Sequence, residues 1–474
     1  MLTYNLADRG ERSLYESLYR HIRDDILCGN LRPDDRLPSK RGLAEHLGVS
    51  VITVEGAYRQ LMAEGYISSR ERSGYYVRPI SVPPRAERVR PTRGAQVRHP
   101  CAIADFTSAS ASADPSFARL WEKALRDTIS SEPERELFSA QPAQGAPRLR
   151  EALATWLAQA RGMTVDPDRI VIAAGAPLLY GLIALLHGAD GPVALESPGY
   201  RRLQSIYETM GEPVVAVPLD GEGIDMSELD RSGASLVHVM PSHQFPTGIV
   251  TSVSRRYELL GWASRTVGRY IVEDDYDWEF RLAGKPIPSL GSIDTEGKVI
   301  YLSTFSKSLS PALRIAFGVF PPSLDDSLEH ALRCFSSTVG IIEQIALARL
   351  MESGEYERHV SRYRNRSRNA RDRLLEALRT CPAADRLSFE ECDSGLHFVL
   401  RVDTCAKAAD IAEQAAKRGV GLAPIERYDM GAMRAPDGSA CFVMQYDGVD
   451  TESFERAASV ISASIELSEQ RCRI

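Results

Sequence analysis

The sequence predicts a multidomain protein: a small N-terminal winged helix-turn-helix domain and a larger α/β domain with a mainly parallel sheet. Three observations support this. Residues 1–78 contain three short helical patterns followed by an alternating ribbon. Residues 79–103 are rich in proline and arginine and have no periodicity. From residue 104 onward, short apolar runs alternate with helical patterns, which is typical of parallel α/β sheets. A chain of 474 residues has room for two or three domains.

The composition excludes several classes of protein. Hydrophobic residues make up 43% of the chain, which supports full cores, and the net charge of −7 gives no whole-chain nucleic-acid signature. The eight cysteines are scattered without a C-x-x-C pair, so we expect free thiols and not a disulfide frame or zinc site. The sequence has no apolar run of membrane-spanning length and no signal-peptide pattern at its start. We therefore expect a cytoplasmic protein.

The N-terminal domain is predicted from four consecutive segments. Residues 14–28 carry apolar side chains at four-residue spacing and form an amphipathic helix, which a proline-containing turn follows. A second helix covers Lys40 to Leu47, between a serine cap and a glycine. Ser50 can cap a third helix that ends near Glu64, and residues 66–77 alternate like a two-stranded ribbon. In a winged helix-turn-helix the third helix enters the major groove of DNA.

Residues 31–67, L-R-P-D-D-R-L-P-S-K-R-G-L-A-E-H-L-G-V-S-V-I-T-V-E-G-A-Y-R-Q-L-M-A-E-G-Y-I, resemble the GntR-family DNA-binding domain, and the similarity extends over nearly all of residues 12–78. The resemblance implies that DNA is contacted by Arg41, Ser50, Thr53, Ser73 and Gly74. Val51 and Arg72 depart from the family pattern, which commonly has arginine and glycine there, and this puts the half-site sequence in doubt. A purely structural helical cap is the alternative.

Residues 79–103 are predicted to be an extended linker, because prolines favour semi-rigid spacing. Five arginines in this stretch are accompanied by a single acid, Glu87. Such a run is either simply solvated or adds non-specific phosphate contacts that weaken as salt rises.

The most informative stretch is Val299 to Phe320, where an apolar strand runs into a cluster of hydroxyls around Lys307. A lysine at the end of a buried strand can be desolvated, which lowers its pKa and frees the amine for a Schiff base with an aldehyde. The hydroxyls, including Thr304, and the fork of Arg314 suit a phosphate. An aldehyde and a phosphate on one ligand indicate pyridoxal 5′-phosphate (PLP). The alternative for this motif alone is a solvated surface loop.

A second motif, Arg269 to Phe280, is another apolar strand that runs into acidic residues. Asp274 and Tyr276 lie two apart and share a face of an extended segment, so a carboxylate can meet the pyridine nitrogen and a phenol the ring's 3-oxygen. A divalent-metal site would need further ligands at matching spacing, which we do not find, so we predict no metal. Together the two motifs resemble fold-type I, aspartate-aminotransferase-like proteins.

This resemblance implies further contacts. Strand, turn and helix patterns at Arg169 to Tyr180 would place Gly175 and Ala176 on the cofactor phosphate, at a helix N-terminus. Tyr200 matches the residue that stacks on the pyridine ring, and Arg202 is a candidate clamp for an effector carboxylate. At the asparagine of the family's H-N-P-T-G segment, which hydrogen-bonds the ring oxygen, this chain has Phe245.

A smaller α/β lobe is predicted beyond about residue 340. It would contain a long helix from about 340 to 378, strands near 395–402 and 441–446, and a closing helix from Thr451. Aminotransferases place a carboxylate-binding arginine on a late strand of this lobe. The strand from Cys441 to Asp447 has none, and the nearest arginines, Arg427 and Arg434, lie in the preceding loop.

The combination of P-S-H-Q-F-P-T-G, E-D-D-Y-D and S-T-F-S-K-S-L-S-P-A-L-R with the N-terminal pattern is similar to the MocR/GabR-type subfamily of GntR transcriptional regulators. These fuse a winged helix-turn-helix to an aminotransferase class I/II-like domain. The resemblance implies a DNA-binding domain at 1–78, a linker at 79–103 and a PLP-binding effector domain at 104–474. It also implies that a small amine or amino acid is sensed through an external aldimine that displaces Lys307.

The resemblance further implies a head-to-tail homodimer that signals through the linker. Two alternatives stay open. One is a functional PLP-dependent aminotransferase with an N-terminal regulatory module. The other is a DNA-binding protein whose C-terminal domain is cofactor-free and structural. We expect effector sensing with little or no steady turnover, because the small lobe lacks the carboxylate-binding arginine.

Overall fold

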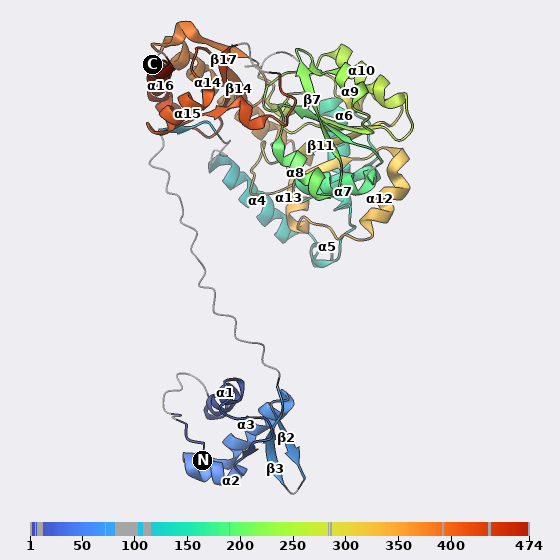
Figure 1. The fold of residues 1–474 in the computed structure, drawn as a ribbon. Coiled ribbons are helices and arrows are strands. Elements are labelled where there is room, and N and C mark those ends of the chain that lie inside the picture. Colours follow the sequence, from blue (N-terminus) through green and yellow to red (C-terminus); the bar gives the residue numbers. More distant parts are fainter. Residues whose placement is uncertain are drawn as a thin grey trace. The chain divides into compact units, whose positions relative to one another are not determined.

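The computed structural model describes residues 2–4, 6, 13–71, 73–80, 103–107, 115–188, 190–282, 284, 287–390, 393–434 and 438–472 (Figure 1). The chain divides into two compact units, Met1–Arg98 and His99–Ile474, which are described separately. Most of the predicted linker, residues 81–102, and Arg72 lie outside the described residues. Within the described ranges, no helix has the length and apolar character needed to span a membrane.

The N-terminal unit is a winged helix-turn-helix, as predicted (Figure 1). Its elements are α1 (Leu14–Leu27), β1 (Arg36–Leu37), α2 (Lys40–Leu47), α3 (Val51–Ala63), β2 (Ile67–Arg70) and β3 (Gly74–Val77). The proline-containing stretch after α1, which was expected to be only a turn, contributes β1, and β1 pairs antiparallel with β3. A two-residue strand is too short to show an alternating pattern in the sequence.

This unit has a hydrophobic core of its own. All three helices contribute fully buried side chains, among them Leu18, Leu43, Val54 and Tyr58. The hydroxyl of Tyr58 donates to the backbone carbonyl of Pro38 across 2.9 Å, so the buried ring leaves no polar group unsatisfied. Because the residues that form this core all lie within positions 2–80, we expect this unit to fold without the rest of the chain.

The larger unit is built on an eight-stranded sheet with the order β5-β12-β11-β10-β9-β6-β7-β8. The strands are β5 (Ile170–Ala173), β6 (Val193–Ser197), β7 (Val214–Asp220), β8 (Gly223–Ile224), β9 (Leu236–Val239), β10 (Tyr270–Asp274), β11 (Val299–Thr304) and β12 (Ala316–Val319). β12 runs antiparallel to both neighbours and β8 antiparallel to β7, whereas the other pairs are parallel. The prediction of a mainly parallel sheet is confirmed.

Helices cover both faces of this sheet (Figure 1). They are α4 (Pro115–Ser131), α5 (Glu134–Phe138), α6 (Pro147–Arg161), α7 (Ala176–His187), α8 (Arg201–Thr209), α9 (Met226–Arg231), α10 (Val253–Ser264), α11 (Leu290–Ile293), α12 (Asp325–Leu332) and α13 (Ile341–Glu352). Successive residues of a strand face opposite sides. Ile170 and Ile172 accordingly pack in the core with α6 and α13, whereas Val171 and Ala173 pack with α7 and α12.

The small lobe contains α14 (Glu355–Thr380), β13 (Leu387–Glu390), β14 (His397–Asp403), α15 (Ala408–Ala416), β15 (Val420–Gly421), β16 (Ala423–Pro424), β17 (Ser439–Gln445) and α16 (Phe454–Cys472). The two predicted strands and the closing helix are present. The single long helix expected from 340 to 378 was wrong, because Gly354, with φ of +69°, separates α13 from α14. α13 packs in the large-lobe core, so the small-lobe core begins within α14.

The segment at 103–107 belongs to the small lobe. β4 (Ala104–Asp105) pairs parallel with β15, and Phe106 is fully buried in the small-lobe core. The backbone N–H of Gln445 donates to the Phe106 carbonyl, and the Gln445 side-chain amide donates to the Thr107 carbonyl, each across 3.2 Å. The described chain that follows the predicted linker is therefore held first by the small lobe.

Candidate functional site

A cavity of about 510 Å³ lies where the loops after several large-lobe strands face the small lobe. Eight of the nine residues predicted for cofactor and effector line it: Ala176, Tyr200, Arg202, Asp274, Tyr276, Thr304, Lys307 and Arg314. The ninth, Gly175, lies directly against Arg314. The structure therefore brings together residues that are spread over more than a hundred positions of the sequence.

Lys307 lies in the loop that follows β11 and is half-buried in the cavity wall. Burial lowers its pKa, whereas the carboxylates of Asp277 and Asp447 act in the opposite direction. A lysine with a lowered pKa has more of the neutral amine that attacks an aldehyde.

Asp274, the last residue of β10, is 2% exposed and is held from two directions. Its Oδ2 accepts a hydrogen bond of 2.5 Å from the Tyr180 hydroxyl and lies 3.5 Å from Nε2 of His238. Burial, followed by the charge of Asp274, raises the pKa of Tyr180, so that this hydroxyl remains a donor. The carboxylate is thus fixed in the cavity wall, as the partner of a pyridinium N–H must be.

Gly175 and Arg314 form a phosphate cradle between β5 and α7. Gly175 has φ of +93°, a backbone conformation that favours glycine. In addition, a Cβ atom at this position would overlap the Arg314 guanidinium. The guanidinium therefore lies against the N-terminus of α7. Thr304 and Ser306, joined by a 2.9 Å hydrogen bond between their hydroxyls, line the same cavity. Guanidinium, hydroxyls and a helix N-terminus are a donor set that suits a phosphate, so these residues fit PLP.

Aromatic rings form the side of the cavity near Tyr200. The Tyr200 and Phe245 rings meet edge to face with centroids 6.2 Å apart, and Phe245 meets Tyr428 of the small lobe at 5.1 Å. Thr107, Tyr180, Met240, Tyr428 and Gln445 also line the cavity and were not predicted. They come from elements that are distant in sequence and carry no local motif that could have indicated them.

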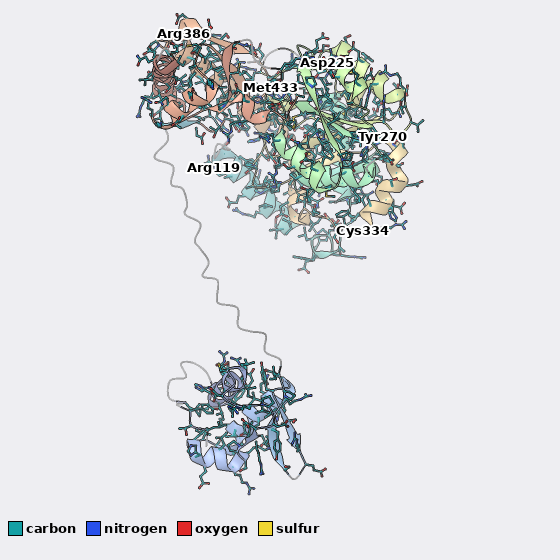
Figure 2. The ribbon with its side chains drawn as sticks, viewed as in Figure 1. Arg119, Asp225, Tyr270, Cys334, Arg386 and Met433 are labelled. Atoms are coloured by element: carbon teal, nitrogen blue, oxygen red, sulfur yellow. The ribbon has the colours of Figure 1, made fainter. Side chains whose placement is uncertain are left out.

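The two arginines of the small-lobe loop differ in position. Arg427 lines the cavity, as Arg202 does. Arg434 instead pairs with Asp225 of the large lobe across 2.6 Å; Figure 2 labels Asp225 and Met433, the residue that precedes Arg434. Arg427 and Arg202 are therefore the arginines available to an acidic group of a ligand, and Arg434 is engaged elsewhere.

An acid, Asp447, lies two residues after the end of β17, in the segment where aminotransferases were expected to place a carboxylate-binding arginine. Asp447 is 8% exposed, and its Oδ2 accepts a hydrogen bond of 2.6 Å from the Tyr363 hydroxyl. Burial raises the pKa of Asp447, while Tyr363 and the charge of Lys307 lower it. This negative group near Lys307 is unfavourable to a ligand carboxylate at the same place.

The predicted DNA contacts lie on three parts of the N-terminal unit: the start of α3, the first turn of α2 and the β2–β3 hairpin. Ser50 caps α3, because its Oγ accepts the Thr53 backbone N–H across 3.1 Å. Arg41 is exposed on the first turn of α2, and Ser73 and Gly74 form the tip of the β2–β3 hairpin, where Gly74 has φ of +115°. Ile52, which lies between the predicted contacts Ser50 and Thr53, is 80% exposed at the first turn of α3. An exposed apolar residue there can contact thymine methyl groups in a major groove.

The sequence matches two families: bacterial regulatory proteins of the gntR family over residues 14–77, and aminotransferase class I and II over residues 110–461. It is 35% identical to the uncharacterized HTH-type transcriptional regulator YhdI of Bacillus subtilis over 90% of both chains. It is also 30% identical to the probable rhizopine catabolism regulatory protein MocR of Rhizobium meliloti, over 95% of this chain and 93% of that protein. The chain belongs to the MocR-type subfamily of GntR regulators.

A further relative of this MocR-type regulator is the pyridoxine biosynthesis transcriptional regulator PdxR of Corynebacterium glutamicum, 30% identical over 96% of both chains. Among solved structures, kynurenine aminotransferase of Pyrococcus horikoshii has a TM-score of 0.68 at 23% identity, covering 78% of this chain and 91% of that chain, and shares the fold. The MocR-type chain is accordingly a DNA-binding transcriptional regulator whose aminotransferase-like domain binds PLP.

Proposed function

We propose that this regulator binds DNA as a head-to-tail homodimer in the cytoplasm and senses a small amine or amino acid at Lys307. The observation that supports this most is that Lys307, Asp274 and the Gly175–Arg314 cradle meet in one cavity, which Arg202 and Arg427 also line. Bound PLP supplies an aldehyde that an effector amine can take over from Lys307. The linker at 79–103 then carries the change to the winged helix. A regulatory response requires that the effector favour one arrangement of the protein over another.

The proposal assigns a role to several residues in and around the cofactor cavity. Asp274 holds a proton on the pyridine nitrogen, and the Tyr180 hydroxyl holds Asp274 by a hydrogen bond. Tyr200 covers a ring face, and the Gly175–Arg314 cradle fixes the phosphate. Arg202 and Arg427 would attract an acidic group that lies at a distance from the amine, because Asp447 disfavours one beside Lys307.

The proposal can be tested by adding candidate amines to the PLP-loaded full chain. Each amine should be followed in parallel by the absorbance of the bound cofactor and by DNA affinity. An effector is expected to change both, with midpoints at the same concentration. An amine that changes the absorbance fully while DNA affinity stays constant for every compound tried would contradict the sensing role. A chain that shows no cofactor absorbance before or after loading would instead support a cofactor-free domain.

Turnover is expected to be slow or absent with ordinary α-amino acids. The late strand β17 is followed by Asp447, and residues 441–447 contain no arginine, so this segment offers no clamp for an α-carboxylate beside Lys307. A misplaced substrate can cost on the order of a hundredfold in rate. The measurement is pyridoxamine phosphate and keto-acid formation after mixing with amino acids and keto acceptors. Several turnovers each second with any of the amino acids would favour a second candidate function. This is a working aminotransferase with a regulatory module, which the residues of the cofactor site also allow.

Arg41→Ala is expected to weaken DNA binding by about 1–3 kcal/mol if its guanidinium makes a bidentate contact to a base. The loss should appear on specific DNA in fluorescence anisotropy at fixed salt, or as relaxed preference at one base position. Arg20→Ala is the matched control, since it removes an equal charge from α1, where Arg20 pairs with Glu16 at 2.9 Å. Equal losses in both variants would show that only the overall charge of the domain matters.

A further inference from the structure

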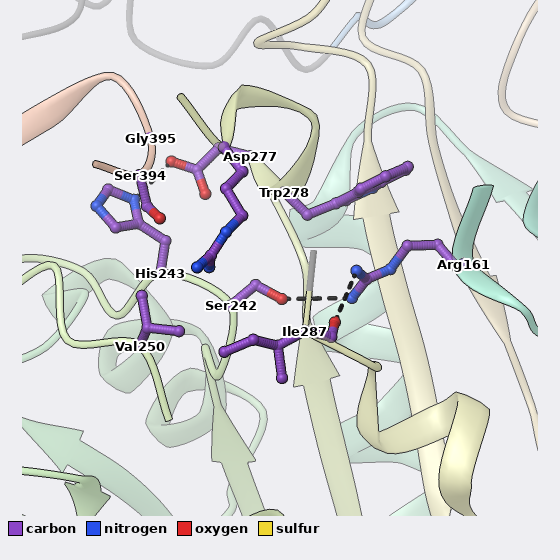
Figure 3. A pocket seen from close by; sticks show the side chains of 10 residues that line it. Arg161, Ser242, His243, Val250, Asp277, Trp278, Ile287, Ser394 and Gly395 are labelled. Carbon is purple, nitrogen blue, oxygen red and sulfur yellow. Dashed lines mark hydrogen bonds and ion pairs between the residues drawn. The ribbon is translucent and has the colours of Figure 1, made fainter. Parts of the chain in front are cut away.

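A group of buried side chains lies around the start of the short helix η2 (Trp278–Phe280). His243, Asp277 and His397 each place one nitrogen or oxygen atom within 4.8 Å of the others. The expectation that the acidic segment has no partner cluster was wrong, because residues from three distant elements cannot be recognised by spacing. Nδ1 of His243 and Oδ2 of Asp277 are hydrogen-bonded at 2.8 Å, which fixes the chain just before η2 (Figure 3).

Glu279 of η2 has a buried carboxyl that is bonded to the first turn of α14. Its Oε1 accepts a hydrogen bond of 2.8 Å from the Tyr356 hydroxyl. Burial, followed by the charge of Glu279, raises the pKa of Tyr356, so the phenol keeps its proton. η2 is also held by Arg161, whose guanidinium lies over the Trp278 ring at 4.8 Å (Figure 3). Glu279 is therefore a fixed acceptor for the Tyr356 proton.

The Tyr356 hydroxyl also meets the residue that follows Lys307. Oγ of Ser308 lies 3.0 Å from the Tyr356 hydroxyl oxygen. A phenol has one proton, which Tyr356 donates to Glu279, so Ser308 is the donor of this second bond. The Tyr356 ring in addition packs edge to face against Phe305, with centroids 5.5 Å apart. Tyr356 thus holds the chain on both sides of Lys307.

His359, one turn further along α14, holds the same loop by its backbone. Its Nε2 lies 2.8 Å from the Ser308 carbonyl oxygen, and because a carbonyl can only accept, Nε2 carries the proton of this bond. Phe305, Ser308, Tyr356 and His359 are each at most 2% exposed. Ser306 and Lys307 line the cofactor cavity, whereas Ser308 does not. The loop of Lys307 therefore has one side on the cavity and is bonded to α14 on the other.

α14 contributes to the cores of both lobes. Tyr356 and Val360 near its start pack in the large-lobe core, whereas Leu374 and Leu378 near its end pack in the small-lobe core. Its 26 residues span roughly 39 Å at the usual helical rise. A small tilt at the first turn of α14 therefore displaces the small-lobe core by more than it displaces the first turn itself.

We propose that the Ser308–Tyr356 hydrogen bond couples the loop of Lys307 to α14 and so transmits the release of Lys307 to the small lobe. This rests on the proposed function, in which an effector amine replaces Lys307 on the cofactor. After that exchange the cofactor no longer holds the loop, whereas the contacts with α14 persist. Breaking the bond would leave a buried hydroxyl of Ser308 without an acceptor, which is costly. Loop and helix therefore move together.

The test uses the PLP-loaded full chain and aminooxyacetate, whose amine takes the cofactor from Lys307 regardless of the natural effector. A C=N bond forms between the probe nitrogen and the aldehyde carbon of the cofactor, and the C=N bond to Nζ of Lys307 breaks. The two hydrogens of the probe nitrogen pass to Nζ. Loss of the lysine-linked absorbance reports the exchange, and fluorescence anisotropy reports DNA affinity. At saturating probe the DNA affinity of the wild type should change by about 5-fold to 150-fold.

Ser308→Ala should undergo the exchange at a similar probe concentration, but its change in DNA affinity should be about fivefold smaller, because one buried hydrogen bond is removed. The bond between Tyr356 and Glu279 stays intact in this variant. Ser303→Ala is the matched control. Ser303 is 3% exposed, and its hydroxyl donates to the Asp275 carbonyl across 3.0 Å, within the large lobe. This control should keep the full change in DNA affinity.

Tyr356→Phe removes the same bond from the other side and keeps the ring. Its change in DNA affinity should be reduced at least as far as in Ser308→Ala. The double variant should show no further loss than Tyr356→Phe alone, because both substitutions remove one interaction. Additive losses would show that the two side chains act separately, and the proposed coupling would then be wrong.

Two other outcomes would overturn the proposal: a full change in DNA affinity in Ser308→Ala, or an equal loss in Ser303→Ala. If Ser308→Ala does not fold, Tyr356→Phe is compared with Tyr301→Phe. Tyr301 is 1% exposed and donates to Oδ2 of Asp275 across 2.9 Å, so equal losses in these two variants would contradict the coupling.

The wild type separates this proposal from the proposed function on which it rests. Complete exchange without any change in DNA affinity contradicts the coupling alone. A PLP-treated wild type that shows no lysine-linked absorbance contradicts the proposed function itself.

Discussion

Lys307→Ala is expected to abolish the response of DNA binding to every amine effector while leaving basal DNA affinity unchanged. The amine of Lys307 is the group that an effector would replace on the cofactor, whereas the N-terminal unit has its own core and does not include this residue. Removing a half-buried lysine whose pKa is lowered by burial should cost little stability, because a charge that is costly to bury is removed with it. Effector titrations of DNA affinity and of cofactor absorbance provide the measurement.

The matched control for this experiment is Lys298→Ala. Lys298 immediately precedes β11, and its ammonium lies over the Tyr270 ring at 5.7 Å and not in the cofactor cavity. It should keep both the cofactor spectrum and the effector response. Recovery of a reducible, covalently attached cofactor from Lys307→Ala would show that another lysine carries it.

The isolated residues 1–80 should bind DNA with two half-sites at least about a hundredfold more weakly than the full chain does. One small domain makes few phosphate contacts. In a dimer held together by the larger unit, DNA affinity increases because the second winged helix is already near the second half-site. Because residues 14–80 have a closed core, the fragment should remain folded. Fluorescence anisotropy of both proteins over a range of salt concentrations measures the difference, and the fragment should show the shallower salt dependence.

DNA with a single half-site serves as the control for the dimer. There the fragment and the full chain should bind with similar affinity. If the fragment binds the two-half-site DNA as tightly as the full chain, the larger unit contributes nothing to DNA binding. The proposal that the full chain binds DNA as a dimer would then be wrong.

The sheet and most of the cofactor wall could be predicted because their signals are local. Strands such as β10 and β11 are buried on both faces and therefore appear as short continuous apolar runs. Each of these runs ends in polar residues, and the ends of adjacent parallel strands lie at one edge of a sheet. For this reason Asp274 and Lys307, 33 positions apart, could be assigned to one site before the fold was known.

What could not be predicted depends on packing between distant elements. Tyr180 and His238 hold Asp274, but neither has a motif that shows this. The different positions of Arg427 and Arg434 follow from the Arg434–Asp225 ion pair between two lobes. The break at Gly354 was missed because a glycine within a helical pattern is compatible both with continuation and with a turn.

The pairing of β4 with β15 has a mechanical consequence. Lys307, Asp274 and Arg314 all belong to the large lobe, so the cofactor anchors do not depend on the small lobe for their mutual spacing. The chain at 103–107, in contrast, is bound to the small lobe through the pairing of β4 with β15. Thr107 lines the same cavity as Tyr428 and Gln445. Closing the small lobe over an effector would pull on residue 103 directly. In the proposed function, a movement of the small lobe on effector binding would therefore reach residue 103, where the described chain after the linker begins.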